Sequence, residues 1–408
     1  MKEKLVLIGN GMAGMRTIEE LLKLAPDKYD ITVFGAEPHG NYNRIMLSPV
    51  LAGDKTIDEI ITHDVQWYQD HNIDLHTDTT VTAIDRVKRE VIADDGSAVS
   101  YDRLILATGS NPFMLPLPGS ELEGVISFRD INDVNTMIET AKTHNNAVVI
   151  GGGLLGLEAA NGLMQQGMGV TVVHRSDTLM NQQLDHVAAG LMRVELEAKG
   201  LKFLMNHATQ ALMGSDRVEK VQFDDGTDIA ADLVVMAIGV RPNTALAKKA
   251  GVLCDRGILV NDTLQTYTPN IYAVGECVQH REQTFGLVAP LFEQAKVCAN
   301  HLANIGIAVY MTTATATQLK VTGIDLFSAG DFRGDGQSQS IIYKDPQRFI
   351  YKKLVIKNNT IIGIVLYGDT HDGQWYFSML NEQQDISALR STLVFGQQYC
   401  EHLEKVAV

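Results

Sequence analysis

The sequence has little cysteine and little tryptophan. Only four of its 408 residues are cysteine, and no two of them form a C-x-x-C pair. This spacing excludes a zinc ribbon, a dithiol redox motif and an iron–sulfur cluster held by one short segment. So few cysteines also argue against stabilisation by disulfide bonds. We therefore expect the protein to reside in a reducing compartment. The four cysteines are Cys254, Cys277, Cys298 and Cys400.

Basic charge and long apolar runs are scarce as well. Lys and Arg number 34 against 49 Asp and Glu, and the formal net charge of −15 argues against nucleic acid or an anionic membrane as a partner. No apolar run is long enough to cross a bilayer, and the first one ends at Gly9, too early for a signal peptide. We therefore expect a cytoplasmic protein that binds neither nucleic acid nor membrane.

Glycine is frequent, and two glycine-rich turns carry the strongest signal. The first turn (LVLIGNGMAG) covers residues 5–14 and the second (VVIGGGLLG) covers 148–156. Each follows a short apolar strand and opens a helical pattern, which is the context of a dinucleotide fingerprint. Such glycines let backbone N–H groups approach a pyrophosphate at the positive end of a helix dipole. The residues predicted to bind cofactor here are Gly9, Asn10, Gly11, Met12, Ala13 and Gly14, then Gly151, Gly153, Leu154, Leu155 and Gly156.

Glu37 and Arg44, which follow the first turn in the sequence, fit the same kind of site. Glu37 follows the predicted strand 31–34, about twenty positions after the glycines, where a carboxylate can bond ribose hydroxyls. The alternative is a solvated loop acid. Residues 41–50 are predicted to form a loop, from which Arg44 can reach the pyrophosphate.

The pattern of strand, glycine turn and helix occurs twice, and this duplication predicts two parallel sheets. A chain of 408 residues is also expected to split into two or three domains. Residues 351–357 and 361–367, separated by Asn358-Asn359, predict a β-hairpin in a small third domain. The predicted domains are a discontinuous FAD-binding domain (1–115 and 245–310), an NAD(P)H-binding domain (116–244) and a C-terminal α+β domain (311–408).

The second turn leaves the choice of pyridine nucleotide open. An NAD site would place a carboxylate after strand 170–173, but His174-Arg175 stand there. Arg175 can pair with a 2′-phosphate, or both residues can be solvent-facing loop positions, so NADPH and NADH remain alternatives. Glu158 lies on the first turn of the following helix, where it either complements the helix dipole or orients the nicotinamide as a catalytic residue.

Further motifs complete a recognisable set. With residues 107–109 (ATG) and 272–276 (YAVGE), the two turns resemble the pyridine nucleotide–disulfide oxidoreductase superfamily. The strings at 8–12 (IGNGM), 151–160 (GGGLLGLEAA) and 285–290 (FGLVAP) are similar to the flavin-bearing part of the NAD(P)H-dependent nitrite reductase large subunit.

This resemblance implies an α/β fold with two Rossmann-like dinucleotide-binding domains, as in glutathione reductase, and a small α+β domain. It implies FAD at the first turn, NAD(P)H at the second, and electron transfer from NAD(P)H through FAD to a separate acceptor protein. A helix after Pro290 is our candidate for stabilising the reduced flavin with its N-terminus. The remaining residues predicted at the cofactors are Ser48, Val81, Ala107, Thr108, Gly109, Arg129, His174, Arg175, Gly239, Gly275, Glu276 and Pro290.

Three departures from the relatives matter. The cysteine clusters of the iron–sulfur and sirohaem domains are missing, so we expect an electron-transfer component whose partner is an iron–sulfur, rubredoxin-type or haem/sirohaem protein. Pro49 follows Ser48 where related ferredoxin reductases carry a Lys that pairs with the counterpart of Glu158. The segment Met46-Leu47-Ser48 contains no cysteine and Cys277 is interpreted as a packing residue, so thiol chemistry is not expected.

Three functions remain alternatives at this stage. The favoured one is an FAD-dependent NAD(P)H oxidoreductase serving nitrite or nitrate reduction. The second is a rubredoxin or ferredoxin reductase with no link to nitrogen, and the third is a redox-sensing flavoprotein with little turnover. No resident metal is predicted, and a homodimer stays open as one oligomeric state.

Overall fold

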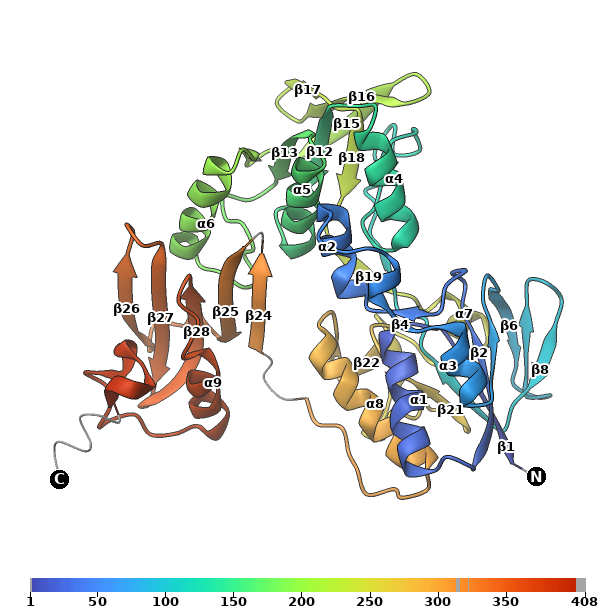
Figure 1. Cartoon of the computed structure of the whole chain (residues 1–408). Helices are drawn as coiled ribbons and strands as arrows, with labels where there is room; N and C mark the ends of the chain where they lie inside the picture. The colour runs from blue at the N-terminus through green and yellow to red at the C-terminus, as the bar shows by residue number, and fades with distance from the viewer. Residues whose placement is uncertain (1, 313–315, 322, 401–408) are drawn as a thin grey trace.

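The computed structural model describes residues 2–312, 316–321 and 323–400, which form three units (Figure 1). The first unit is built on a five-stranded parallel sheet of order β21-β9-β1-β2-β5. Its central strand β1 is buried because both faces are covered, which is typical of parallel sheets. The sheet strands are β1 (Glu3–Ile8), β2 (Tyr29–Phe34), β5 (Ile73–His76), β9 (Arg103–Leu106) and β21 (Ile271–Ala273).

Helices and small sheets surround this first sheet. Helix α1 packs along α8, so that segments almost 280 residues apart in sequence lie side by side (Figure 1). The helices are α1 (Met12–Leu24), α3 (Val65–Asp70), α7 (Ala245–Lys249) and α8 (Val288–Leu302), with the 3₁₀ turn η2 (Asp58–Ile60). The minor strands are β3 (Asn41–Tyr42), β4 (Ile61–His63), β6 (Val81–Asp85), β7 (Glu90–Ala93), β8 (Ala98–Ser100), β20 (Ile258–Val260), β22 (Val278–His280) and β23 (Gln283–Thr284).

The second unit repeats the architecture with a parallel sheet of order β11-β18-β12-β13-β14. Its strands are β11 (Val125–Ile126), β12 (Asn146–Ile150), β13 (Gly169–His174), β14 (Lys202–Met205) and β18 (Leu233–Met236). Its helices are α4 (Ile131–Ala141), α5 (Leu154–Gln165) and α6 (His186–Ala198), and a three-stranded antiparallel sheet contains β15 (Thr209–Gly214), β16 (Val218–Phe223) and β17 (Asp228–Ala230). The two parallel sheets predicted from the duplicated pattern are confirmed.

Two crossings of the chain join the first and second units. Strand β10 (Ser110–Pro112) leads out of the first unit and pairs antiparallel with β19 (Val240–Pro242), which leads back. Helix α2 (Leu47–Ala52) adds a further link: it follows β3 in the chain, yet its buried side chains belong to the core of the second unit, against α5 (Figure 1).

The third unit is a five-stranded antiparallel sheet of order β24-β25-β28-β27-β26 with one helix. The predicted hairpin is confirmed as β27 and β28, and Asn358 and Asn359 have φ angles of 52° and 58°. Positive φ at both central residues matches the twist of a two-residue hairpin, and asparagine tolerates it. The elements are β24 (Ala316–Val321), β25 (Ile324–Gly330), β26 (Gln339–Asp345), β27 (Ile350–Lys357), β28 (Thr360–Tyr367), α9 (Gly373–Glu382) and the 3₁₀ turn η3 (Leu393–Phe395).

The third unit docks on the second through polar contacts around a shared apolar core. The Tyr351 and Tyr367 hydroxyls donate to Asp185 Oδ2 and Glu195 Oε2, each at 2.8 Å. Val365 packs in the same apolar cluster as residues of α5 and α6. The sheet of the third unit therefore packs on α6 and on the loop that precedes it.

Two sequence-based expectations about local structure were wrong. Residues 41–50 are not a loop, because β3, the 3₁₀ turn η1 (Arg44–Met46) and α2 cover most of them. Pro49 is tolerated in the first turn of α2, where the backbone N–H groups have no helical partner. For the same reason Pro290 lies inside α8, which begins at Val288, rather than before it. None of the helices in the described parts of the chain is long and apolar enough to span a membrane.

The contact between α2 and α5 predicts a stability difference between two helical glycines. A Cβ on Gly162 would lie 2.5 Å from Leu51 Cγ, whereas a Cβ on Gly190 in α6 would meet nothing within 4 Å. Gly162→Ala should therefore lower the free energy of unfolding by about 1–2 kcal/mol through overpacking. Gly190→Ala should raise it by up to about 1 kcal/mol through helix propensity. Urea unfolding of both variants measures this, and equal effects would contradict the packing.

Candidate functional site

The first glycine turn is closed by the neighbouring strand and open on the helix side. Gly9 has φ of 109°, and a Cβ there would collide with the carbonyl oxygen of Ala107, which follows β9. A Cβ on Gly14 would lie 2.7 Å from the Gly9 oxygen. By contrast, a Cβ on Gly11 would meet nothing within 4 Å. The turn thus leaves free space beside Gly11, at the N-terminus of α1, where an anion is favoured.

The second glycine turn repeats this geometry. Gly151 has φ of 123°, and a Cβ there would collide with the carbonyl oxygen of Ala237, which follows β18. A Cβ on Gly156 would collide with the Gly151 oxygen, while the space beside Gly153 is open within 4 Å. Both turns therefore fit the backbone approach of a pyrophosphate. Leu154 and Leu155 begin α5 here, as Met12 and Ala13 begin α1 in the first unit.

Asn10 ties the first turn to two later segments of the same unit. Its Oδ1 accepts a hydrogen bond of 2.7 Å from the Tyr68 hydroxyl, and its backbone oxygen accepts one of 3.0 Å from Asn41 Nδ2. Burial raises the pKa of Tyr68 to about 12, so the hydroxyl stays protonated as a donor. Neither Tyr68 nor Asn41 was among the predicted site residues, since they follow Asn10 by 58 and 31 residues.

Glu37 and Arg44 meet each other. Arg44 Nη2 lies 2.7 Å from Glu37 Oε1, and the Tyr42 hydroxyl donates to Glu37 Oε2 at 2.8 Å. The other Arg44 nitrogen, Nη1, donates to the backbone oxygen of Arg129 at 2.6 Å. Arg44 thus orients the carboxylate predicted to bind ribose, and its own contact with a pyrophosphate stays a prediction.

Glu276 is held by two donors. Ser110 Oγ donates to Glu276 Oε2 at 2.6 Å, and Arg129 Nη2 forms an ion pair with the same oxygen at 2.5 Å. Gly109, with φ of 65°, lies beside this arginine: a Cβ on it would be 3.8 Å from Arg129 Nη2. The predicted residues of three distant segments are therefore brought together at one place.

Gly275 joins this cluster to the first glycine turn. A Cβ on Gly275 would lie 3.0 Å from Ala13 Cβ, and the Gly275 N–H donates to Gln294 Oε1 of α8 at 2.8 Å. Gln294 is fully buried and was not among the predicted site residues. A glutamine on an otherwise apolar helix face is the sequence signal that could have identified it. Pro290 lies one turn earlier on α8. The Thr108 hydroxyl instead donates to the Asn243 oxygen at 2.7 Å, beside the second crossing between the units.

Two predicted residues lie apart from these contacts. Val81 is buried at the start of β6, where it pairs with Ala93. Gly239, with φ of 114°, precedes β19, and a Cβ on it would meet nothing within 4 Å. Their contact with a cofactor stays a prediction.

Ser48 and Glu158 form a direct link between α2 and α5. Ser48 Oγ donates to Glu158 Oε2 at 2.6 Å. Burial raises the pKa of Glu158, and the hydrogen bond from Ser48 opposes that rise only in part. Among the described residues no cation pairs with this carboxylate. The Ser48 hydroxyl is therefore the donor that lies next to Glu158.

His174 supports the second turn through both ring nitrogens. Its Nδ1 accepts a hydrogen bond of 3.1 Å from the Gly152 N–H, and its Nε2 lies 3.1 Å from the Thr178 oxygen. Burial lowers the pKa of His174, which favours the neutral ring that this pair of contacts requires. Arg175 is exposed and forms no ion pair with any residue that the structure describes.

The four cysteines are unpaired, and three of them are buried. Cys277 is fully enclosed next to Glu276, and burial raises its pKa to about 11. Burial also raises the pKa of Cys298. A thiol in such surroundings is inert, in line with the packing role expected for Cys277. Within the described residues, no group of His, Cys, Asp and Glu is arranged to hold a metal ion.

Comparison with known families assigns the fold and its class. The pyridine nucleotide-disulphide oxidoreductase family model matches residues 3–301, and the chain belongs to this family. The rubredoxin NAD⁺ reductase C-terminal domain matches residues 316–384, within the third unit. Family membership confirms the predicted fold class, the oxidoreductase activity, and FAD with NAD(P)H as cofactors.

Two curated relatives are similar to nearly the whole chain. The chain is 52% identical over 386 residues to the nitrite reductase [NAD(P)H] of Bacillus subtilis, covering 95% of this chain and 48% of that protein. It is 46% identical to the assimilatory nitrate reductase electron transfer subunit of the same organism, covering 96% of this chain and 51% of that one. The chain therefore spans about half the length of these curated relatives. The predicted resemblance to the nitrite reductase large subunit is confirmed.

A solved structure matches most of the chain. The NADH:rubredoxin oxidoreductase of Clostridium acetobutylicum superposes with a TM-score of 0.80 at 25% sequence identity, covering 95% of this chain and 97% of that one. All three units described above therefore have counterparts in one known protein.

The buried Glu158 predicts a pH dependence of stability. Because its pKa is raised in the folded protein, the native state binds its proton more tightly than the unfolded chain does. Stability should therefore fall as pH rises above the ordinary value of 4.5, and Glu158→Gln should remove this loss. The gain in unfolding free energy of Glu158→Gln over the parent should grow from about pH 4 to about pH 8, in urea titrations. The exposed Glu139 gives the control variant Glu139→Gln, and a gain that does not change with pH would contradict the prediction.

The buried thiols predict resistance to alkylation. A pKa of about 11 lowers the thiolate fraction of Cys277 at neutral pH by about two orders of magnitude relative to a free cysteine. Iodoacetamide should therefore label the native protein only at the half-buried Cys254, without loss of NAD(P)H oxidation, and should label all four thiols after unfolding. Mass spectrometry of the labelled peptides measures this. Rapid labelling of Cys277 with loss of turnover would show that a thiol takes part in the chemistry.

Proposed function

We propose that this protein takes electrons from NAD(P)H through FAD and delivers them to a separate iron–sulfur, rubredoxin-type or sirohaem protein in nitrite or nitrate reduction. The observation that carries the proposal is the duplicated glycine turn. In both units the first glycine of the turn has no room for a side chain, because a Cβ would collide with a facing carbonyl oxygen. The space beside Gly11 and Gly153 is open. One chain thus offers two similar sites for a pyrophosphate, as expected for two dinucleotides.

We propose that FAD binds the first unit (1–115 and 245–310) and NAD(P)H the second (116–244). When bound, FAD supplies an isoalloxazine that accepts two electrons and releases them singly. Arg44 orients Glu37, and Arg129 with Ser110 orients Glu276. We propose that these two carboxylates bind ribose and ribityl hydroxyls. The Ser48–Glu158 pair lies where the two units meet and is our candidate for orienting the nicotinamide.

The place in nitrogen metabolism is supported by the two Bacillus subtilis relatives, whose names describe nitrite reduction and electron transfer in nitrate assimilation. The matched region is about half of each. The name of the nitrate relative, an electron transfer subunit, supports a separate partner protein as the acceptor. An acidic chain with four unpaired thiols also suits the reducing cytoplasm that we propose as its location.

A second candidate is a rubredoxin reductase without a role in nitrogen metabolism. It is favoured by the match of the third unit to the rubredoxin NAD⁺ reductase C-terminal domain and by the NADH:rubredoxin oxidoreductase structure, which the chain covers almost completely. The higher identity to the nitrite and nitrate proteins makes this the second choice.

The proposal predicts a flavoprotein that NAD(P)H reduces. The purified protein should show an FAD spectrum without iron–sulfur or sirohaem bands, and anaerobic NADPH or NADH should bleach it within one turnover. Ferricyanide should then be reduced steadily. Stopped-flow absorbance measures both steps. A colourless protein that does not take up FAD would overturn the proposal.

Reconstitution separates the two candidate acceptors. Faster reduction of a sirohaem-containing nitrite reductase module than of rubredoxin, at equal concentrations, supports the nitrogen role. The opposite order supports the rubredoxin reductase.

A further inference from the structure

A chain of hydrogen bonds leads from the first glycine turn to α1 through His63. This histidine ends β4, and Asn41 of β3 is its partner across the strand pair. The His63 Nδ1 atom lies 3.2 Å from Asn41 Oδ1, and Nε2 lies 2.9 Å from Glu19 Oε1. Only 5% of His63 and 3% of Asn41 are exposed to solvent. The protein itself must therefore satisfy both ring nitrogens.

The contact of Asn41 with the glycine turn fixes the orientation of its amide. Asn41 Nδ2 donates to the backbone oxygen of Asn10 at 3.0 Å, and a carbonyl oxygen can only accept. The amide therefore presents Oδ1, which is also only an acceptor, to the ring of His63. It follows that Nδ1 of His63 carries a hydrogen. The Tyr68 hydroxyl accepts from the Asn41 N–H at 3.2 Å and donates to Asn10 Oδ1, and so joins the same network.

The other ring nitrogen of His63 faces a carboxylate. The hydrogen bond from His63 lowers the pKa of Glu19, so that this carboxylate is ionised at neutral pH. Because an ionised carboxylate only accepts hydrogen bonds, Nε2 must carry a hydrogen as well. Both nitrogens are donors only in the imidazolium form. The two contacts together therefore require a positively charged His63.

The other titratable groups near His63 do not compete for its ring. Arg16 lies 3.4 Å from Oε2 of Glu19, the oxygen that does not face the ring, and supports the ionised acid. Asp64 accepts from the Trp67 N–H at 2.9 Å and thereby caps α3. The titratable groups on the elements packed against His63 are Arg16, Glu19, Glu20 and Lys23 of α1, His39 and Tyr42 in and before β3, and Asp64, Tyr68, Asp70 and His71 in and before α3.

We propose that His63, as an imidazolium, is a positioning residue for FAD that holds the first glycine turn through Asn41 and Asn10. The inference rests on the proposed binding of FAD by the first unit. As long as His63 donates to Asn41 Oδ1, the amide is held with Nδ2 on the turn. The backbone next to the open space beside Gly11 is thus fixed before the dinucleotide arrives, which favours binding.

A rise in pH breaks this link at a defined point. When the ring releases one proton to solvent, its remaining hydrogen goes to the stronger acceptor, which is the carboxylate of Glu19. The buried Oδ1 of Asn41 then faces a ring lone pair and has lost its donor. The amide is no longer fixed, so the turn loosens and FAD is released faster.

FAD release from the full-length holoprotein tests this role without turnover. FAD dissociates when the holoprotein is diluted, and the recovery of flavin fluorescence gives the dissociation rate constant. In the parent protein we expect this rate constant to be about tenfold larger at about pH 8.5 than at about pH 6.

Glu19→Gln should remove the pH dependence and keep the slow release. A glutamine amide can donate to Nε2 while the neutral ring keeps its hydrogen on Nδ1 for Asn41, so the network survives deprotonation. Because the Glu19 side chain is 23% exposed, this substitution leaves the core intact. His63→Gln has a donor for only one of the two acceptors, and we expect it to release FAD about tenfold faster at both pH values.

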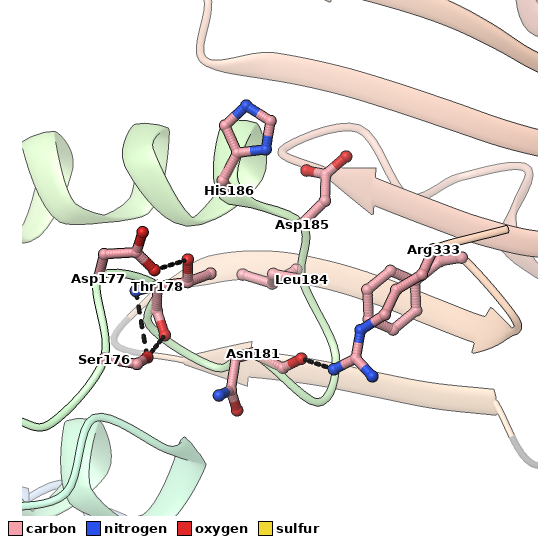
Figure 2. Close-up of a pocket in the computed structure, with 9 residues that line it drawn as sticks. Ser176, Asp177, Thr178, Asn181, Leu184, Asp185, His186 and Arg333 are labelled. Atoms are coloured by element: carbon pink, nitrogen blue, oxygen red, sulfur yellow. Dashed lines mark hydrogen bonds between the residues drawn. The ribbon is translucent and has the colours of Figure 1, made fainter. Parts of the chain in front are cut away.

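Two other histidines give matched controls. His71→Gln removes an exposed histidine of the same unit, next to Trp67. His186→Gln removes an exposed histidine at the start of α6, which Figure 2 shows at the pocket between the second and third units. Both variants should keep the rate constants of the parent and their change with pH.

Two results would overturn the inference. One is FAD release from the parent protein at the same rate at both pH values, and the other is a Glu19→Gln protein whose release still accelerates with pH as in the parent. Bleaching of the bound flavin by NAD(P)H alongside either result would leave the proposed function standing. A protein purified without FAD would instead refute the proposed function.

Discussion

The close approach of each glycine turn to a neighbouring strand is the constraint on which both cofactor sites depend. Gly9 and Gly151 donate their N–H groups to the second strand of their sheet, to Phe34 and Val173, and each faces the carbonyl of the residue after another strand. No side chain fits there. Because the turn packs closely against the neighbouring strand, the start of the following helix is fixed relative to the sheet. The N–H groups at the N-terminus of that helix then point into open space. The same backbone conformation occurs in both units, and it underlies the proposal of two similar anion sites in one chain.

Polar contacts between single side chains supplement the apolar core that the units share. Ser48 of α2 reaches Glu158 of α5, Tyr351 and Tyr367 of the third sheet reach the carboxylates of Asp185 and Glu195, and Arg129 reaches Glu276. Each contact places a buried or half-buried carboxylate, which would be costly to leave without a donor. Together with the shared apolar core, these contacts hold the units against one another and so fix the separation of the two proposed dinucleotide sites. Catalysis by cofactors depends on that separation more than on any single acid or base.

Local pattern was a good guide wherever the backbone itself carried the signal. The glycine turns, the duplicated βαβ units and the Asn358-Asn359 hairpin all follow from φ preferences and periodicity, which act within a few residues. The prediction of a loop at 41–50 was wrong for a related reason. A proline at position 49 indicates a break, yet the first turn of a helix accepts it, and the apolar face of α2 finds its partner about 100 residues away on α5. No window of neighbouring residues contains that partner.

Sequence alone was sufficient for the fold class, the two nucleotide fingerprints and the family, because each depends on residues close together in the chain. Only the tertiary structure revealed that the Ser48 hydroxyl donates to Glu158 and that Gln294 accepts a hydrogen bond from the Gly275 N–H. It alone placed His63 between Asn41 and Glu19. The reason is physical: hydrogen bonds between segments separated by tens to hundreds of residues are created when the sheets pack, and no local preference encodes them.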